Sequence, residues 1–406
     1  MNTSNTILED PFFYNNPNTL QLPLCKCEPE AEEAEVPNIT LIIILLPLLS
    51  FCGLICNIIS IIIFTKYSKS VSNSNLYLAG LSISDIGVCC SGIFIITADS
   101  LRKYFLIVNE IFARLIPFLI PLGFTFQMFS VYITILASVD CYVFVITQKY
   151  PNDNNENPKK GIFKIFSSDT LKKYCTDRMY AYKALGGTII FVIAYNAITF
   201  WELQSIHCFD KITQIEKIEV CPTSMRINDN YVKFYKGYSY SFFMAGFPFF
   251  LLSLLTVGIL KEMKPISKLS TTMTSQLKNS VNIHSQLLLF NRKRSFRNLF
   301  STSNEMDEKS ESSPVMLVMV VILFLVCNMV TLIVNYLETT EEVISFALQM
   351  VLIDIANFLV VFNATANFFI YISFSRSYRK RLGEICSLKT CTIIKNEENI
   401  TEISKV

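Results

Sequence analysis

Long apolar stretches alternate with polar connections along the whole chain of 406 residues. A helix needs about 20 apolar residues to cross the hydrocarbon core of a bilayer, which is about 30 Å thick. Seven stretches have that length, at residues 39–65, 75–98, 111–147, 182–202, 234–260, 315–337 and 344–373. The pattern predicts an all-α membrane protein built as a seven-transmembrane helix bundle.

Composition and charge add an orientation to this bundle. Hydrophobic residues make up 51% of the chain and charged residues 17%, a balance that is rare in soluble proteins of this length. Most of the 35 Lys and Arg residues lie in the connections on one side of the predicted membrane, and cytoplasmic connections carry the excess of positive charge. We therefore expect a multi-pass protein with an extracellular amino terminus and a cytoplasmic carboxyl terminus.

The two terminal segments are expected to play different parts. Residues 1–36 form an acidic extracellular tail without the apolar segment of a signal peptide, so the first span is expected to act as its own insertion signal. Acceptor sequences at Asn2 and Asn38 predict glycosylation. After the transmembrane domain, residues 37–373, the cytoplasmic tail 374–406 begins with a short basic amphipathic helix. Basic residues at the inner membrane face are expected to contact membrane lipids and not nucleic acid.

Polar residues interrupt the last apolar stretch, which reads DIANFLVVFNATANFFIY from Asp354 to Tyr371. It carries Asp354, Asn357, Asn363 and Asn367, and burying such groups in hydrocarbon is costly unless they meet partners inside a helical bundle. Some of them could serve only to join helices through hydrogen bonds. Four of them in one span indicate a functional site inside the bundle.

The end of this span resembles a known motif. Asn367-Phe-Phe-Ile-Tyr371 is similar to the Asn-Pro-x-x-Tyr signature of rhodopsin-like (class A) G-protein-coupled receptors, with Phe368 where proline is usual. The narrower resemblance is to invertebrate FMRFamide-type neuropeptide receptors, and it rests on the whole last span together with Gln127, Ser130-Val-Tyr-Ile-Thr134, and Cys327-Asn328 followed by Asn335 and Glu338. The resemblance extends over all seven spans. It implies a plasma-membrane receptor for an amidated neuropeptide, typically ending in Arg-Phe-amide, that activates a heterotrimeric G protein.

The resemblance also implies an activation network in the middle of the bundle, made by Asn57, Asp85, Ser130, Asn328, Asn363, Asn367 and Tyr371. In class A receptors an aspartate at the position of Asp85 forms a sodium pocket. The matching oxygen donors here are Ser130, Asn363 and Asn367, which suit a hard monovalent cation. Either a sodium ion occupies this site or the side chains bond only to one another. No other cofactor is expected.

A cationic peptide with an amidated phenylalanine suggests roles for seven further residues. Its arginine needs a carboxylate, which Asp354, Glu202 and Glu338 offer. Gln127 and Asn335 are candidates for the terminal amide, although Gln127 could instead bond to a neighbouring helix. Tyr235 and Tyr238 share a helical face with Tyr231 and are candidates for packing on the phenyl ring; placement at the membrane interface is the alternative.

Two departures from the family put parts of this assignment in question. Asp140-Cys141-Tyr142 stands where the family has Asp/Glu-Arg-Tyr facing the G protein, and a thiol lacks the permanent charge and the fork of a guanidinium. The family's disulfide at the top of the third span is also lost, because Ile116 stands at that position. A bond between Cys208 and Cys221 is our first expectation, and a bond from this loop to Cys25 or Cys27 is the alternative.

Other functions remain as alternatives to a signalling peptide receptor. A chemosensory receptor for a small molecule would share the bundle, and a peptide binder with weak or no G-protein coupling would explain Cys141. A transporter would favour repeated halves around a site in the membrane, and the sequence has no evident internal repeat. No hydrolase triad, phosphate-binding glycine loop or metal-ligand spacing is evident in the sequence, so we do not expect an enzyme.

Overall fold

The computed structural model describes residues 39–66, 73–102, 104–149, 177–210, 215–263, 314–340 and 346–385. Seven helical segments in these ranges are long and apolar enough to cross a membrane, namely Thr40–Thr65, Asn73–Arg102, Leu106–Thr147, Arg178–Trp201, Tyr231–Met263, Pro314–Val334 and Leu348–Phe374. The predicted seven-transmembrane helix bundle is therefore confirmed. The acidic tail with Asn2 and Asn38, and the Cys25 and Cys27 thiols, lie outside the described residues.

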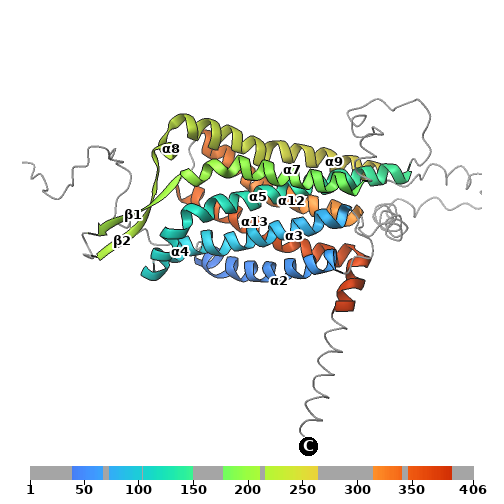
Figure 1. Ribbon diagram of the computed structural model, residues 1–406, viewed down its shortest axis with the longest axis horizontal. Coiled ribbons are helices and arrows are strands. Elements are labelled where there is room, and N and C mark those ends of the chain that lie inside the picture. The colour runs from blue at the N-terminus through green and yellow to red at the C-terminus, as the bar shows by residue number, and fades with distance from the viewer. Residues whose placement is uncertain are drawn as a thin grey trace, which may run out of the picture.

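The seven spans are assembled from helical elements that lie side by side along one axis (Figure 1). The elements are η1 (Ile39–Leu45), α2 (Leu46–Thr65), α3 (Asn73–Ser91), η2 (Gly92–Thr97), α4 (Ala98–Arg102), α5 (Leu106–Lys149), α7 (Arg178–Asn196), η4 (Ala197–Trp201), α8 (Ser224–Ile227), η5 (Tyr231–Ser239), η6 (Ser241–Gly246), α9 (Phe247–Met263), α12 (Pro314–Thr340) and α13 (Phe346–Phe374). Residues 376–385 form a further helix, which turns away from α13.

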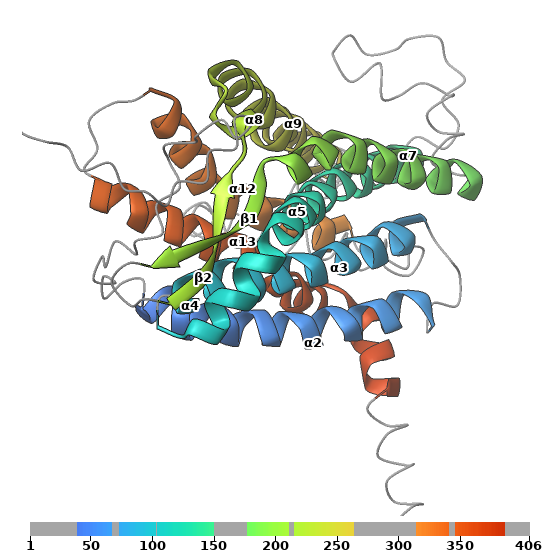
Figure 2. The same ribbon diagram turned by 60° about the vertical axis from the view of Figure 1, so that its left-hand side comes forward.

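A β-hairpin marks one end of the bundle, called here the hairpin end. Strand β1 (Leu203–Asp210) pairs antiparallel with β2 (Ile215–Pro222). Figure 2 shows this hairpin lying across the helix ends beside α4 and α5. The opposite end, called here the Tyr378 end, holds the helix of residues 376–385.

Among the described residues, the largest cluster of buried apolar side chains lies toward the Tyr378 end. There, buried apolar side chains of α2, α3, α5, α9, α12 and α13 form one continuous cluster that includes Ile63, Ile259 and Tyr371. Tyr378 joins it through its ring, which lies 5.4 Å from that of Tyr371, and through a hydrogen bond of 2.9 Å to Ser60. The helix of residues 376–385 is thus held against α2 and α13.

Val330 and Phe368 stand at two positions where class A receptors carry proline. Helix α12 continues without a break through Val330, and α13 continues through Phe368. Proline kinks a helix because it removes one backbone hydrogen bond and clashes with the preceding turn. Neither of these two helices has that cause for a kink.

π-Helical turns occur instead in the hairpin-end halves of three spans, as η1, η2 and the successive segments η5 and η6. A π-helix bonds residue i to i+5 and is therefore wider than an α-helix. Side chains in these wider turns point in other directions than they would in an α-helix, and this changes which tyrosines of the fifth span share a face.

Candidate functional site

Two of the polar residues predicted in mid-membrane, Ser130 and Asn367, meet at Asp85, which is completely buried on α3. Ser130 of α5 donates a hydrogen bond of 3.0 Å to one carboxylate oxygen, and the Asn367 amide of α13 donates one of 2.8 Å to the other. Both bonds come from neighbouring helices. The carboxylate therefore joins three spans through charge-assisted hydrogen bonds, which are the stronger kind.

Further oxygens on α2 and α13 belong to the same predicted network. The Asn57 amide donates to the carbonyl oxygens of Gly53 and Ala364, at 3.0 and 3.1 Å. Within the described residues, four buried side-chain oxygens of the network have no hydrogen-bond partner: Asn57 Oδ1, Asn363 Oδ1, Asn367 Oδ1 and Tyr371 Oη. Buried polar atoms are usually paired, so a donor set of one carboxylate with amide and hydroxyl oxygens fits a water or a hard cation.

A site for a transition metal is a separate question. In the ranges that the structure covers, no group of three or more His, Cys, Asp or Glu residues is placed to hold a metal ion. The donor set around Asp85 is limited to oxygen and contains one carboxylate, which is the chemistry of a weakly held alkali cation and not of zinc.

The Asp140-Cys141-Tyr142 segment lies inside the bundle near the Tyr378 end. Asp140 accepts a hydrogen bond of 2.7 Å from Ser74 of α3. Cys141 is 6% exposed and packs within the main apolar cluster with Tyr142. The three residues were predicted to face a G protein, but in this conformation all of them are buried. Asp140 bonds to a neutral hydroxyl, and its neighbour Cys141, which stands at the family's Arg position, carries no permanent charge to pair with it.

A cavity of about 190 Å³ lies toward the hairpin end, between α3, η2, α5 and α13. Its wall is mainly apolar, with side chains such as Ile95, Phe124 and Val361. The polar groups are Ser91, whose hydroxyl bonds to the Gly87 carbonyl, and the amides of Gln127 and Asn357. Neither amide makes a hydrogen bond to the part of the chain that the structure describes. Two primary amides are thus available to one ligand.

Gln127 also borders a second and much smaller cavity, of about 20 Å³, between α5, η6, α9 and α12. Asn328 and Thr331 of α12 line this space. The Asn328 amide is engaged, because it donates to the Phe324 carbonyl at 2.8 Å. Gln127 therefore lies between the larger cavity and the sixth span, where the sequence predicted a ligand contact or a bond to a helix.

Asp354 and Asn357 lie on the same face of α13, because residues three apart in a helix are neighbours. Asp354 is half-buried and lies one turn closer to the hairpin end. Asn357 was not among the predicted ligand contacts, although its spacing from Asp354 was a usable signal. The structure describes the backbone of Asn335 and Glu338 but not their side chains, so their predicted ligand contacts stay predictions.

Glu202 differs from its predicted role as a carboxylate open to a ligand at the rim. It is buried, and it binds Tyr231 Oη at 2.6 Å, Lys236 Nζ at 2.8 Å and Arg226 Nη1 at 3.5 Å. Two cations from the same chain, Lys236 and Arg226, thus already pair with this carboxylate, and its contact with a ligand stays a prediction. Lys236, which the sequence did not single out, also lies 4.7 Å from the centre of the Phe124 ring, and Phe124 lines the larger cavity.

The two predicted ligand tyrosines separate in the structure. Tyr235 stacks on the rings of Tyr195 and Tyr231, at 5.4 and 5.1 Å, and donates a hydrogen bond to the Tyr195 carbonyl. Tyr238 points away, is 54% exposed and lies beside Phe234. The prediction of a shared face is wrong because it assumed an α-helix, whereas η5 is a wider π-helix in which residues three apart diverge.

The expected bond between Cys208 and Cys221 is also wrong. Cys221 is disulfide-bonded, but the hairpin register places it opposite Gln204 and places Cys208 opposite Lys217. Four positions along a strand correspond to about 13 Å, and a disulfide requires Cα atoms within about 7 Å. The alternative partners, Cys25 and Cys27, lie outside the described ranges.

Comparison with known proteins gives two relatives, and no family model matches the chain. The chain is 29% identical over 355 residues to the probable G-protein coupled receptor frpr-1 of Caenorhabditis elegans, a match that covers 86% of this chain and 80% of the relative. It is 22% identical over 341 residues to the FMRFamide receptor of Drosophila melanogaster, covering 83% of this chain and 52% of that protein. Both matches are long enough to include most of the seven-helix bundle.

Proposed function

We propose that this chain, a seven-helix G-protein-coupled receptor similar to the FMRFamide-type neuropeptide receptors, binds a short amidated peptide in the cavity between α3, η2, α5 and α13. The observation that carries the proposal is the pair of amides, Gln127 and Asn357, that face this cavity without other partners among the described residues. A carboxamide both donates and accepts hydrogen bonds, as these two side chains do. The amide end of a peptide can therefore satisfy both.

The apolar wall suits an aromatic side chain next to that amide. A cavity of about 150 Å³ is large enough to bind benzene, and this one measures about 190 Å³. Phe124, Ile95 and Val361 provide apolar contacts for a phenyl ring. The cavity thus supports a ligand that ends in phenylalanine amide.

Asp354 supports a basic residue before that phenylalanine. It lies one helical turn from Asn357 toward the hairpin end, which is the direction in which the rest of a peptide would extend. A guanidinium can bind a carboxylate through two hydrogen bonds. Together the three groups favour an Arg-Phe-amide end, with Asp354 for the arginine and with Asn357 and Gln127 for the amide.

The proposed orientation places the hairpin end outside the cell, and we propose the plasma membrane as its location. At the Tyr378 end, exposed basic residues flank the spans: Lys66, Lys261, Arg376, Arg379 and Lys380. Positive charge marks the cytoplasmic side. The helix of residues 376–385 then lies on the inner surface, in contact with anionic lipid.

Signalling would follow from a population shift. A peptide that binds one helix arrangement more tightly stabilises it and opens the Tyr378 end to a G protein. Burial of Cys141 in the present arrangement agrees with a resting conformation. The oxygens around Asp85 and Asn367 support a sodium ion that favours this resting arrangement, because any movement of α13 would separate the two groups.

The test compares Phe-Met-Arg-Phe-amide with the same peptide as a free acid, in calcium and cyclic-nucleotide assays of cells that express the receptor. We expect the free acid to be about 30-fold weaker, since leaving a buried polar group unsatisfied costs about 1–3 kcal/mol. Asn357→Asp and Gln127→Glu should reduce this preference for the amide. Asn228→Asp is the matched control, because Asn228 uses only its oxygen, which accepts from two backbone N–H groups.

Each other outcome selects a different function. Equal potency of the amide and the acid would contradict the assigned cavity. A response only from Cys141→Arg would show a peptide binder that does not couple in its native form. If neither the wild type nor Cys141→Arg responds to the peptide, with surface expression of both verified, the peptide assignment is contradicted and a chemosensory receptor for a small molecule is favoured.

A further inference from the structure

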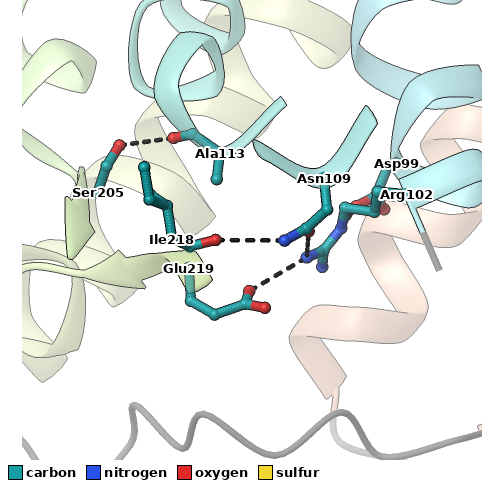
Figure 3. A network of polar contacts seen from close by, with 7 residues as sticks. All are labelled: Asp99, Arg102, Asn109, Ala113, Ser205, Ile218 and Glu219. Carbon is teal, nitrogen blue, oxygen red and sulfur yellow. Dashed lines mark hydrogen bonds and ion pairs between the residues drawn. The ribbon is translucent and has the colours of Figure 1, made fainter. Parts of the chain in front are cut away.

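A polar junction joins the hairpin to the ends of two spans, and Arg102 is at its centre (Figure 3). Arg102 is the last residue of α4. Its Nη1 lies 3.3 Å from Asn109 Oδ1 on α5 and 3.3 Å from Glu219 Oε2 on β2, while its Nε lies 2.8 Å from Asp99 Oδ1. One guanidinium thus connects α4, α5 and β2.

Two hydrogen bonds extend the junction to both strands of the hairpin. The Asn109 amide donates to the Ile218 carbonyl of β2 at 3.3 Å, and the Ser205 hydroxyl of β1 donates to the Ala113 carbonyl of α5 at 2.5 Å. Figure 3 shows these bonds side by side along the start of α5. The hairpin is consequently held at its two strands by one helix.

Burial distinguishes this junction from an ordinary surface ion pair. Asn109 is buried, and the side chains of Arg102 and Glu219 are only 29% and 24% exposed. Arg102 also lies 5.3 Å from the centre of the Phe112 ring, where a guanidinium gains a cation–π contact. By contrast, the side chains of the Arg114–Glu110 pair on the same helix are 59% and 56% exposed. Exposed pairs of that kind contribute little.

The segment that carries Arg102 also forms the wall of the larger cavity. Helix α4 follows directly on η2, and Gly92, Ile95 and Ile96 of η2 line that cavity. A contact that fixes Arg102 therefore also fixes α4, and α4 continues directly from the η2 residues that line the proposed ligand site.

We infer that Arg102 is a positioning residue that holds the hairpin across the helix ends and, through α4 and η2, fixes the rim of the ligand cavity. The guanidinium is suited to this because it can bind three acceptors in one plane, which an ammonium group cannot. The first part, the position of the hairpin, stands on the contacts of Arg102 alone. The second part rests on the proposed function.

Hydrogen–deuterium exchange of the purified full chain in detergent tests the first part without any ligand. In Arg102→Gln, backbone exchange in residues 215–222 should rise about tenfold, the factor expected for the loss of a charge-assisted hydrogen bond. Glu219→Gln should raise it less, and the double variant should add little to Arg102→Gln because the two groups share one interaction. Arg102→Lys should fall between wild type and Arg102→Gln.

The control is Arg114→Gln with Glu110→Gln, which removes the exposed pair and should leave this exchange unchanged. Unchanged exchange in Arg102→Gln, or an equal rise in the control, would overturn the inference. If Arg102→Gln fails to reach the membrane, backbone exchange of residues 215–222 is measured in Glu219→Gln and Asn109→Asp instead. Asn109→Asp keeps an acceptor for Arg102 but loses the donor to Ile218, so hairpin exchange should rise with the ion pair intact.

Dissociation of labelled Phe-Met-Arg-Phe-amide tests the second part. We expect about tenfold faster release from Arg102→Gln than from wild type, at an unchanged unfolding temperature of the bundle. Faster hairpin exchange with an unchanged release rate would confine Arg102 to the hairpin and refute its effect on the cavity. No binding to wild type would contradict the proposed function and leave the exchange result standing.

Discussion

The two ends of this molecule are stabilised in different ways. Around Asp85 and toward the Tyr378 end, α2, α3, α5 and α13 meet through polar atoms buried inside the spans and through one continuous apolar cluster. At the hairpin end, contacts come mainly from short helices and the β-hairpin, as in the Arg102 junction and the Glu202 cluster. The first end keeps polar residues at the family's positions, such as Asp85 and Asn367, although Cys141 and Phe368 depart from its motifs, whereas the second end lacks the family's cysteine at Ile116.

This difference shows where a seven-helix receptor tolerates change. A polar residue in mid-membrane must have a partner, so Asp85 constrains Ser130 and Asn367 at once. At the hairpin end several arrangements can hold a loop: in this chain Arg102 binds Glu219 of the hairpin, Cys221 is disulfide-bonded, and Ile116 stands at the family's cysteine position. Substitutions at the two ends should therefore have different kinds of effect.

The largest effect is expected for Cys141→Arg at the Tyr378 end. The thiol is buried in the apolar cluster, and an unpaired charge there should lower the free energy of unfolding by about 3 kcal/mol or more. Asp140 lies next to it and can recover part of this loss. Thermal unfolding of the purified protein measures the effect, with Cys141→Ser as the uncharged control. An unfolding temperature equal to that of wild type would show that position 141 already opens to solvent.

The buried end was the part that could be predicted from sequence. Seven apolar stretches of sufficient length specify seven spans, and the cost of polar groups in hydrocarbon identified Asp85, Asn57 and Asn367 as residues with partners inside the bundle. Both constraints act on each residue separately, and a single sequence is enough to apply them.

The hairpin end was predicted poorly because its contacts depend on local backbone geometry. Tyr238 was placed on the wrong face because no sequence pattern indicated the π-helix η5. Glu202 was taken as available because its partner Lys236 lies 34 positions later in the chain. The pairing of Cys208 with Cys221 failed because the hairpin turn fixes the strand register, and the sequence analysis did not identify that turn.

The next largest effect concerns Asp354 at the hairpin-end side of the cavity. Asp354→Asn removes the negative charge opposite the proposed arginine, so the concentration of Phe-Met-Arg-Phe-amide for half-maximal response should rise about 10- to 100-fold. A peptide with citrulline in place of arginine is the control and should be equally weak on both receptors. Unchanged potency on Asp354→Asn would remove Asp354 from the ligand site.

A smaller effect links the two ends through sodium. If the oxygens around Asp85 hold sodium in the resting arrangement, replacing choline chloride with sodium chloride should weaken peptide binding about tenfold, since binding at the two sites is reciprocally coupled. Asp85→Asn removes the only carboxylate of that donor set and should abolish the sodium effect. A competition binding experiment at constant ionic strength measures both. A salt effect that survives in Asp85→Asn would place the ion elsewhere.

The smallest effect distinguishes two neighbouring tyrosines at the hairpin end. Tyr235→Phe loses the hydrogen bond to the Tyr195 carbonyl, which is expected to cost about 1 kcal/mol of unfolding free energy. Tyr238→Phe removes a hydroxyl from an exposed side chain and should change stability by less than about 0.5 kcal/mol. Thermal unfolding of the two variants in parallel measures the difference, and each is the matched control for the other. Equal losses would mean that Tyr238 also has a partner inside the bundle. The wide π-helical turn would then be absent in the membrane, and the α-helical face predicted from the sequence would be restored.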